Sequence, residues 1–194
     1  MPTIAAPFNI MNWIDEHPEV FTPPVMNKQF YKEADDVIVF VSKGPNTRND
    51  YHVNPTEELF YQLKGDIVVR IRPSIHEGGE DKPRDVVIRE GEMWLCPRWV
   101  PHPPQRPDDT IGLIVEFPRT HNSDKVLDDG LRWYCPECDT LVHEASFRLK
   151  HIDKDLHEVM DNFWNGPEAG RTCKNCGYVI TRAPEFTFPE HIEA

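Results

Sequence analysis

Short segments rich in β-branched and aromatic residues recur along the chain, and the sequence separates them with 19 prolines and 10 glycines. Segments of this length, bounded by residues that favour turns, predict β-strands. Apolar Val69 and Ile71 alternate with polar Arg70 and Arg72, as in a strand that buries one face. The expected strands are residues 29–31, 37–42, 57–63, 66–72, 85–89, 92–96 and 111–117. Several such strands, joined antiparallel, predict an all-β barrel or sandwich.

Two segments have helical rather than strand periodicity. Asn9 can cap a short helix that runs to about His17. A second helix is expected to begin at Asp153 as its cap and to end at Gly166-Pro167. Its apolar positions recur at helical spacing and are Leu156, Val159, Met160, Phe163 and Trp164. Both apolar stripes are expected to contact the core.

Two connections are also predicted within the strand-rich part. Lys64-Gly65-Asp66 is typical of a tight hairpin turn. Residues 73–84 contain Gly78-Gly79 and several charged residues, so we expect a polar excursion between two strands.

Composition limits the class of protein. The 194 residues suffice for one domain of ordinary size, or for one domain with a small appendage. The longest purely apolar runs, such as residues 37–41, have the length of a strand rather than of a membrane span. The start of the chain does not resemble a signal peptide, so we expect a cytoplasmic protein. A net charge of −12 disfavours nucleic acid and anionic membranes as partners.

Four of the five cysteines form two C-x-x-C pairs, Cys135 with Cys138 and Cys173 with Cys176. Four thiolates in this arrangement favour a tetrahedral structural metal, either zinc or iron. A thiol–disulfide redox function is the main alternative. The fifth, Cys96, is expected to be a buried apolar residue. The composition changes near Leu131, so we divide the chain into a barrel of residues 1–130 and a metal-binding module of residues 131–194.

The spacing of His52, Glu58 and Gly65 resembles the first cupin motif, and the segment from Gly91 to His102 resembles the second. The resemblance implies a cupin-type antiparallel β-barrel, a jelly roll, in which His52, Glu58 and His102 bind a metal. Two imidazoles and one carboxylate suit Fe(II), because they leave positions open for substrate and O2.

Three positions qualify this resemblance. Asn54 stands where many cupins have another histidine, and Trp99 replaces the common glycine of the second motif. Glu57 is a rival carboxylate, because strand alternation alone does not choose between the two glutamates; the motif spacing favours Glu58.

Longer sequence segments around these residues closely resemble the 3-hydroxyanthranilate 3,4-dioxygenase family, and the resemblance extends from about Pro7 to Thr181. The segments are Gly44-Pro45-Asn46-Thr47-Arg48-Asn49-Asp50-Tyr51-His52, Glu57-Glu58-Leu59-Phe60-Tyr61-Gln62 and Pro101-His102-Pro103-Pro104-Gln105-Arg106-Pro107. Pro103 departs from the family, where many relatives have serine.

The resemblance implies an enzyme that opens the ring of 3-hydroxyanthranilate with O2 on the kynurenine pathway towards quinolinate and NAD. It further implies that Arg48 and Arg106 bind the substrate carboxylate, that Glu116 lies near the amino and hydroxyl groups, that the four cysteines hold a second iron, and that the chain is a homodimer.

Other readings stay open at this point. Each arginine could form a structural ion pair, and Glu116 could be a buried structural acceptor. For the whole protein, the alternatives are a non-catalytic cupin that binds a small molecule, a cupin isomerase, and a cupin dioxygenase that acts on another aromatic acid.

Overall fold

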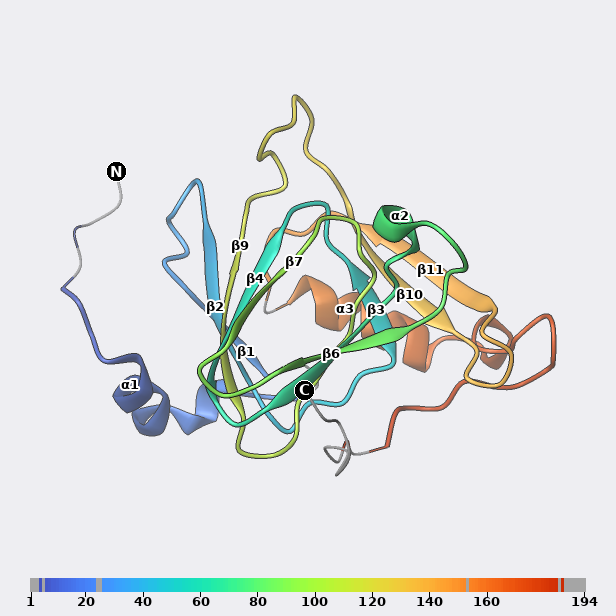
Figure 1. Cartoon of the computed structure of the whole chain (residues 1–194), viewed down its shortest axis with the longest axis horizontal. Helices are drawn as coiled ribbons and strands as arrows, with labels where there is room; N and C mark the ends of the chain where they lie inside the picture. Colours follow the sequence, from blue (N-terminus) through green and yellow to red (C-terminus); the bar gives the residue numbers. More distant parts are fainter. Residues whose placement is uncertain (1–3, 5, 24–25, 153, 185, 187–194) are drawn as a thin grey trace.

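The computed structural model describes residues 4, 6–23, 26–152, 154–184 and 186, and β-strands dominate its regular structure (Figure 1). In chain order the strands are β1 (Asn27–Phe30), β2 (Ile38–Lys43), β3 (Asp50–Val53), β4 (Glu58–Lys64), β5 (Ile67–Ile71), β6 (Arg84–Ile88), β7 (Met93–Cys96), β8 (Pro104–Gln105), β9 (Ile111–Glu116), β10 (Asp129–Tyr134) and β11 (Leu141–Phe147). The α-helices are α1 (Ile10–Glu16), α2 (Ser74–Glu77) and α3 (Asp155–Asn165). The all-β class with a few peripheral helices is confirmed.

The strands form two antiparallel layers. One layer is a five-stranded sheet in the order β1-β2-β9-β4-β7. The other consists of two three-stranded sheets, β11-β10-β3 and β6-β5-β8. Two isolated bridges, Asn46 with Arg106 and His52 with His102, connect the segments around β3 and β8. These bridges join the two smaller sheets at the place where the sequence motifs lie.

The connection at Lys64–Asp66 is not a hairpin, so that expectation is wrong. Strands β4 and β5 belong to different sheets, and the chain passes from one layer to the other between them. Gly65 has a φ of +64°, which suits the sharp change of direction. The excursion at residues 73–84 contains the short helix α2, which was not expected.

Both expected helices are present. The side chain of Asn9 accepts a hydrogen bond from the Asn12 amide at 3.0 Å, which caps α1. Helix α3 ends at Asn165, next to the predicted Gly166-Pro167 stop. The predicted cap of α3, Asp153, lies outside the described residues. No helix in the described part of the chain is long and apolar enough to cross a membrane.

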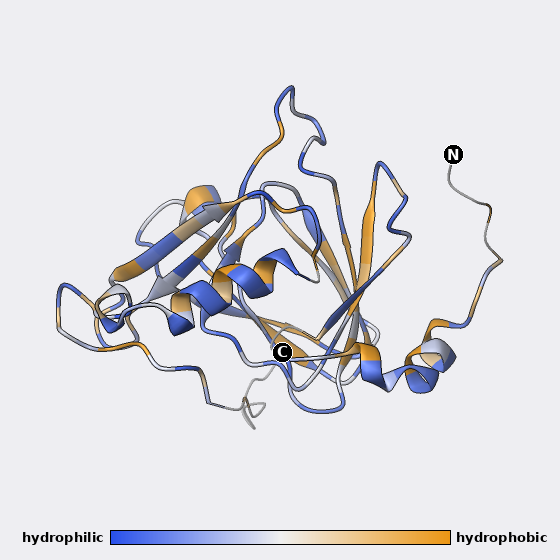
Figure 2. Cartoon of the chain, turned by 180° about the vertical axis from the view of Figure 1, so that it is seen from behind, coloured by the Kyte–Doolittle hydropathy of each residue, from blue (hydrophilic) through white to orange (hydrophobic). Residues whose placement is uncertain are grey.

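Helix α3 packs against the strands and contributes to the main core. The rings of Trp133 on β10 and Phe163 on α3 stack with centroids 4.0 Å apart. Figure 2 shows α3 lying across the strands when the molecule is seen from behind. A division of the chain at residue 130 stays a prediction; such a boundary would fall inside β10, which pairs with β3 on one side and β11 on the other.

Candidate metal centre and active site

His52, Glu58 and His102 converge inside the barrel. One ligand atom from each residue lies within 4.8 Å of the other two, and all three side chains are buried. His52 comes from β3 and Glu58 from β4, while His102 lies just before β8. The structure therefore brings together the three residues that the cupin motifs select.

Hydrogen bonds orient both histidine rings. His102 Nδ1 lies 2.8 Å from the carbonyl oxygen of Val100, and its Nε2 lies 3.0 Å from Glu58 Oε2. A proton on Nδ1 would leave the Nε2 lone pair directed at the carboxylate. His52 Nε2 lies 2.8 Å from Asp129 Oδ2, which leaves Nδ1 of that ring for a metal. Metal-binding histidines commonly donate their other ring N–H to a carboxylate or carbonyl in this way.

The geometry favours Glu58 over Glu57 as the carboxylate of this group. Glu58 is buried and faces His102, whereas the side chain of Glu57 is 39% exposed and lies 4.0 Å from Arg98. Asn54, at the position of the missing histidine, has a supporting contact: its Nδ2 donates to Glu58 Oε2 at 3.4 Å. The candidate metal ligands are therefore one nitrogen from each of two histidines and one oxygen of Glu58.

The charges in this group fit a metal site. Burial by itself would raise the pKa of Glu58, but the His102 and His52 rings outweigh burial and lower that pKa to about 2. Burial disfavours charge on His102 as well, yet Cys96 and Glu58 raise the pKa of His102 well above its usual value. A cation is therefore favoured beside Glu58, and a bound metal ion would take the place of the histidine proton.

The inner face of the five-stranded sheet is arranged in three rows of residues that pair across strands. A metal row, which contains Glu58, lies at one end, and an apolar row lies in the middle. The row at the other end is called the arginine row because Gln62, one of its members, accepts a hydrogen bond from Arg106. The rows are Ile38, Glu116, Glu58 and Cys96; then Phe40, Ile114, Phe60 and Trp94; then Ser42, Gly112 and Gln62. Successive rows are separated by two residues of strand, or roughly 7 Å.

Glu116 lies directly opposite Glu58 in the metal row. Two carboxylates at opposite positions repel each other, and each here has its own positive neighbour. His102 faces Glu58, and Arg119 Nη1 lies 2.7 Å from Glu116 Oε2. Burial raises the pKa of Glu116, with Arg119 opposing the shift and Glu58 adding to it.

Arg119 also connects Glu116 to the ligand group. Its Nε and Nη2 donate to the two carboxylate oxygens of Asp129 at 2.7 and 2.6 Å. Because Asp129 contacts His52, a continuous buried chain of polar contacts runs from Glu116 to the ring of His52.

Arg106 is a buried cation whose charge has no ion-pair partner within the described part of the chain. Its side chain is 1% exposed. Nη1 donates to Gln62 Oε1 at 3.1 Å, and Nε has no hydrogen-bond partner among the described residues. Burial lowers the pKa of Arg106 to about 10, which still leaves the guanidinium positive at neutral pH. A buried positive charge is costly unless an anion pairs with it, so this position favours the binding of an anionic group.

Arg48 has a different setting from Arg106. It is buried beside Asp50, and its Nε donates to both carboxylate oxygens of Asp50 at 3.2 and 3.1 Å. Asp50 and His52 lie two residues apart on β3 and so face the same side of the sheet. Asp50 therefore already neutralises part of the positive charge of Arg48.

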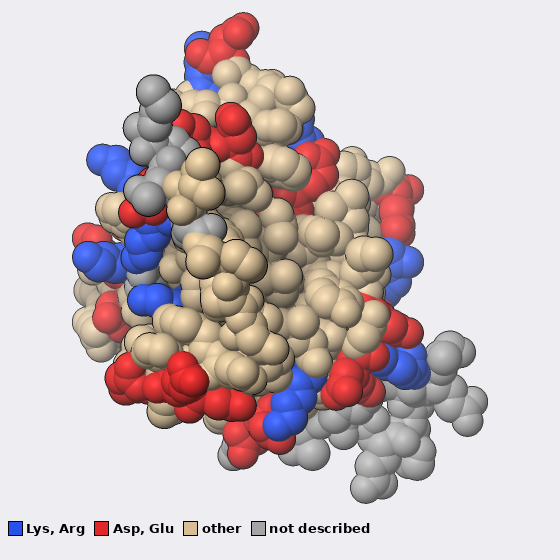
Figure 3. All heavy atoms as spheres, turned by 90° about the vertical axis from the view of Figure 1, so that its left-hand side faces the viewer, with Lys and Arg blue, Asp and Glu red and all other residues tan. Residues whose placement is uncertain are grey.

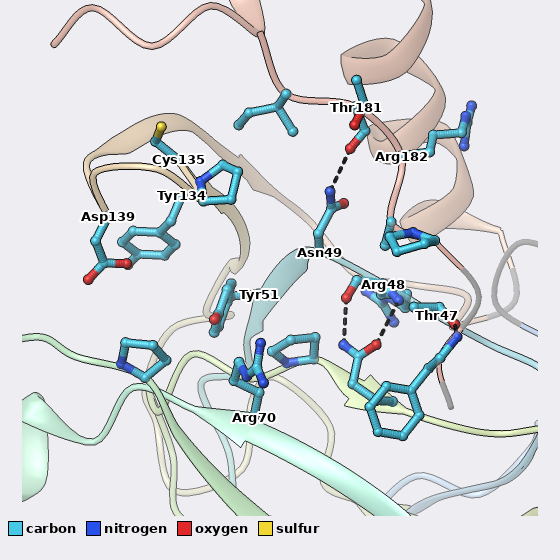
Figure 4. Close-up of a pocket in the computed structure, with 18 of the residues that line it drawn as sticks. Thr47, Arg48, Asn49, Tyr51, Arg70, Tyr134, Cys135, Asp139, Thr181 and Arg182 are labelled. Atoms are coloured by element: carbon cyan, nitrogen blue, oxygen red, sulfur yellow. Dashed lines mark hydrogen bonds between the residues drawn. The ribbon is translucent and has the colours of Figure 1, made fainter. Parts of the chain in front are cut away.

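A cavity of about 510 Å³ lies outside the ligand group, on the other face of β3. Tyr51 and Arg48 line this cavity, whereas His52, Glu58 and His102 are not among its lining residues. Figure 4 shows Tyr51, Tyr134 and Asp139 around the cavity, with Asn49 reaching towards Thr181. Since neighbouring residues of a strand point to opposite faces, this cavity is not the space around the predicted ligands.

The four cysteines of the C-x-x-C pairs also converge, within 4.8 Å of one another. The sulfur of Cys138 lies 3.5 Å from those of Cys173 and Cys176, and no disulfide joins them. Hydrogen bonds from Thr140 and Asn175 lower the pKa of Cys138 to about 6, whereas contacts with the sulfurs of Cys135 and Cys138 raise the pKa of Cys176 to about 12.

The two pairs have the same backbone geometry. In the first, the amide of Asp139 donates to the carbonyl of Cys135 at 2.9 Å, and in the second the amide of Gly177 donates to the carbonyl of Cys173 at 2.9 Å. Asp139 and Gly177 both have a positive φ, 58° and 79°. Two matching turns around four sulfurs fit a tetrahedral metal better than one reactive thiol pair.

The sequence comparisons assign the chain to a family. A family model described as 3-hydroxyanthranilic acid dioxygenase matches residues 3–164. The chain belongs to the 3-hydroxyanthranilic acid dioxygenase family. It is 45% identical to the 3-hydroxyanthranilate 3,4-dioxygenase of Ruegeria pomeroyi over 173 residues, which cover 89% of each chain. It is 42% identical to the enzyme of that name from Xanthomonas euvesicatoria, over 92% of this chain and 94% of the relative.

Solved structures give weaker likenesses. Protein NMB1881 from Neisseria meningitidis is 18% identical with a TM-score of 0.41, over 58% of this chain and 99% of that one. A cupin-2 domain-containing protein from Shewanella frigidimarina is also 18% identical, with a TM-score of 0.40, over 54% of this chain and 91% of that one. Membership of the dioxygenase family therefore rests on the sequence relatives.

Four residues of this family member's site were missed by the sequence analysis: Gln62, Gly112, Arg119 and Asp129. Gln62 belongs to one of the sequence segments that resemble the family, but no feature of the sequence marked it as a site residue. Gly112 lies in a strand that was predicted, where an isolated glycine is a signal of close approach by other atoms. Arg119 lies in a segment without regular periodicity, and Asp129 begins β10, a strand that was not predicted, so neither residue was singled out.

Proposed function

We propose that this chain is a 3-hydroxyanthranilate 3,4-dioxygenase that converts 3-hydroxyanthranilate and O2 to 2-amino-3-carboxymuconate semialdehyde. Besides family membership, one observation carries the proposal: the buried guanidinium of Arg106, which has no ion-pair partner among the described residues, lies beyond the apolar row from the group of His52, Glu58 and His102. An anionic ligand with an apolar middle would match both ends.

The three rows support an aromatic acid as substrate. Its carboxylate would accept two parallel hydrogen bonds from Arg106, which fixes the plane of the ring. The ring would lie over the apolar row, where Phe60 and Ile114 pair across the strands. Its amino and hydroxyl groups, on the two ring carbons that follow the one bearing the carboxylate, would lie on the ring edge that faces the metal row. Arg48 is the proposed second contact for the carboxylate, although Asp50 already neutralises part of its charge.

We assign Fe(II) to His52, Glu58 and His102. When bound there, Fe(II) would supply open coordination positions where substrate and O2 meet. Glu116 is proposed to hold or return a proton at the amino and hydroxyl end of the substrate, because burial raises its pKa and favours the protonated form. Arg119 and Asp129 hold Glu116 and His52 in place.

The second metal would be bound by Cys135, Cys138, Cys173 and Cys176, and is iron or zinc. Its place beside β10 supports a structural role. Asp139, in the first turn, forms an ion pair with Arg72 of the loop after β5, whose guanidinium lies 3.6 Å from the centroid of Tyr134. The metal would therefore hold the turn that contacts the barrel.

We further propose that the chain forms a homodimer through the outer face of the five-stranded sheet. Met93 and Leu95 on the edge strand β7 are 71% and 53% exposed, and they pair with Tyr61 and Leu59 of β4. Figure 3 shows a broad face on this side of the molecule where charged side chains are sparse and gather towards the margins. An exposed apolar face on an edge strand favours association. The cytoplasmic location stays a prediction.

The test of the activity uses the protein reconstituted without oxygen with Fe(II). Addition of 3-hydroxyanthranilate and O2 should consume equal amounts of both and yield the ring-opened semialdehyde. The Arg106→Ala variant should keep its iron and lose affinity for the substrate, whereas Arg148→Ala, which removes an exposed arginine paired with Asp128, should match the wild type.

The same experiment separates the alternatives. Binding of 3-hydroxyanthranilate without oxygen uptake by the iron-loaded protein would favour a non-catalytic cupin. Oxygen uptake with a different aromatic acid, and none with this one, would assign another substrate. No feature of the described structure favours either alternative.

A further inference from the structure

The guanidinium of Arg106 lies directly against Gly112 of β9. A Cβ atom built on Gly112 would lie 2.7 Å from Nη1 and 2.8 Å from Nη2 of Arg106. Contacts below 3.0 Å are shorter than packed atoms allow, so any side chain at this position would displace the guanidinium. Gly112 does not adopt the left-handed conformation that favours glycine, so its requirement is one of space rather than of backbone shape.

Gln62 forms the other wall of the same position. It pairs with Gly112 across strands β4 and β9, and it is 1% exposed. Its Nε2 donates to the carbonyl oxygen of Lys64 at 2.8 Å, and this contact turns the amide so that Oε1 accepts from Arg106 Nη1. One amide thus receives one guanidinium proton and fixes the plane of the group.

We propose that Gly112 and Gln62 are positioning residues that hold Arg106 for a substrate carboxylate, and that they determine the preference for carboxylated aminophenols over the same ring without a carboxylate. The inference rests on the proposed function, since it assigns Arg106 to the carboxylate. Its substance is that two residues without charge set the orientation of the charged one.

The energetics of a buried cation give the expected size of this preference. Arg106 has no ion-pair partner among the described residues, so a substrate without a carboxylate leaves its charge unmatched. Sites that depend on a buried polar contact reject analogues lacking the partner group by about 10⁴- to 10⁵-fold. A shift of about 1 Å in a positioning group costs on the order of 10²-fold in rate. Displacing Arg106 should therefore remove much of the discrimination.

The test compares 3-hydroxyanthranilate with 2-aminophenol, which has the same amino and hydroxyl groups but no carboxylate. For Gly112→Ala we expect kcat/KM for 3-hydroxyanthranilate to fall by about 10²-fold and kcat/KM for 2-aminophenol to fall much less. Gln62→Met keeps the length of the side chain and removes the acceptor, so it should shift the ratio in the same direction. Gly170→Ala is the matched control, because a Cβ at Gly170 meets no atom within 4 Å.

A second readout does not depend on turnover. Anthranilate has the carboxylate and amino group but lacks the ring hydroxyl, and its binding can be measured by calorimetry against aniline. Both variants should bind anthranilate more weakly than the wild type, with metal content and thermal unfolding close to those of the control. This measurement keeps the inference testable with Gln62→Met if Gly112→Ala does not fold.

The outcomes separate the inference from the proposed function. A wild-type protein that binds anthranilate but does not turn over 3-hydroxyanthranilate contradicts the function and leaves the binding comparison intact. If Gly112→Ala and Gln62→Met lower kcat/KM for both substrates equally, or change neither, and bind anthranilate as the wild type does, the positioning role is wrong.

Discussion

His52 Nε2 lies 2.8 Å from Oδ2 of Asp129, a buried carboxylate on β10 that is 77 residues away in sequence. Asp129 therefore fixes the ring of a predicted metal ligand without belonging to either cupin motif. The same carboxylate receives two hydrogen bonds from Arg119, and hydrogen bonds from His52 and Arg119 outweigh burial and lower the pKa of Asp129. Asp129 thus stays ionised and can accept the His52 N–H.

The first prediction follows from this contact. Asp129→Asn keeps the size of the side chain but removes its charge, so His52 loses the partner that orients its ring. We expect metal affinity at the His52 site to fall by roughly 10- to 100-fold. Metal content measured after dialysis against a series of chelator concentrations gives the affinity.

Asp128→Asn is the matched control for this variant. Asp128 is the neighbouring residue, and its carboxylate is 47% exposed and pairs with Arg148 on the surface. Equal metal affinity in the two variants would show that Asp129 does not support His52.

Replacing Cys138 by serine tests the four-cysteine site. The variant should lose one equivalent of metal per chain and unfold at a lower temperature, because three thiolates hold a tetrahedral metal less well. Metal analysis by element should show the equivalent at His52, Glu58 and His102 retained. Glu137→Ala, an exposed residue between the two cysteines of the first pair, should change neither metal. Unchanged metal content in Cys138→Ser would refute the site.

The proposed dimer interface predicts that a charge on β7 separates the two copies. Leu95→Glu places a carboxylate in the middle of the apolar face, beside Leu59. Light scattering after size exclusion should report a dimer for the wild type and a monomer for this variant. Ile75→Glu alters an equally exposed apolar residue on α2 and should remain dimeric. A monomeric wild type, or a dimeric Leu95→Glu protein, counts against this interface.

Sequence periodicity predicted some strands and missed others for a physical reason. Strands β4 and β9 were predicted because they are rich in apolar, β-branched and aromatic residues. β3 has only four residues, in which polar Asp50 and His52 alternate with apolar Tyr51 and Val53, and all four are buried. So short a segment was not recognised as a strand. The strand that carries His52 was therefore found through its motif and not through its pattern.

The choice between Glu57 and Glu58 stayed open because the polarity of β4 is the reverse of the usual one. Its inner face carries the polar Glu58 and Gln62, while its outer face carries the apolar Leu59 and Tyr61. A barrel with polar residues on its inner face and apolar residues on its outer face does not follow the rule that polar residues face water. Contacts such as Arg106 with Gln62 depend on strand register between residues 44 positions apart, which a single sequence does not reveal.

The last prediction concerns how α3 and the barrel fold together. Phe163 of α3 is 5% exposed and stacks on Trp133 of β10, which is fully buried in the main core. Truncating a buried phenylalanine to alanine removes apolar contacts and leaves a cavity, at a cost of about 3–5 kcal/mol. Because Trp133 packs in the same core as Phe60 and Ile114 of the five-stranded sheet, Phe163→Ala should destabilise both layers at once. Denaturant unfolding followed by tryptophan fluorescence and by circular dichroism should show one transition, shifted equally for both signals.

Asn162→Ala, an exposed position on the same helix, should leave the midpoint close to that of the wild type. Two separate transitions, with only the weaker one shifted by Phe163→Ala, would instead support an independently folding module after residue 130.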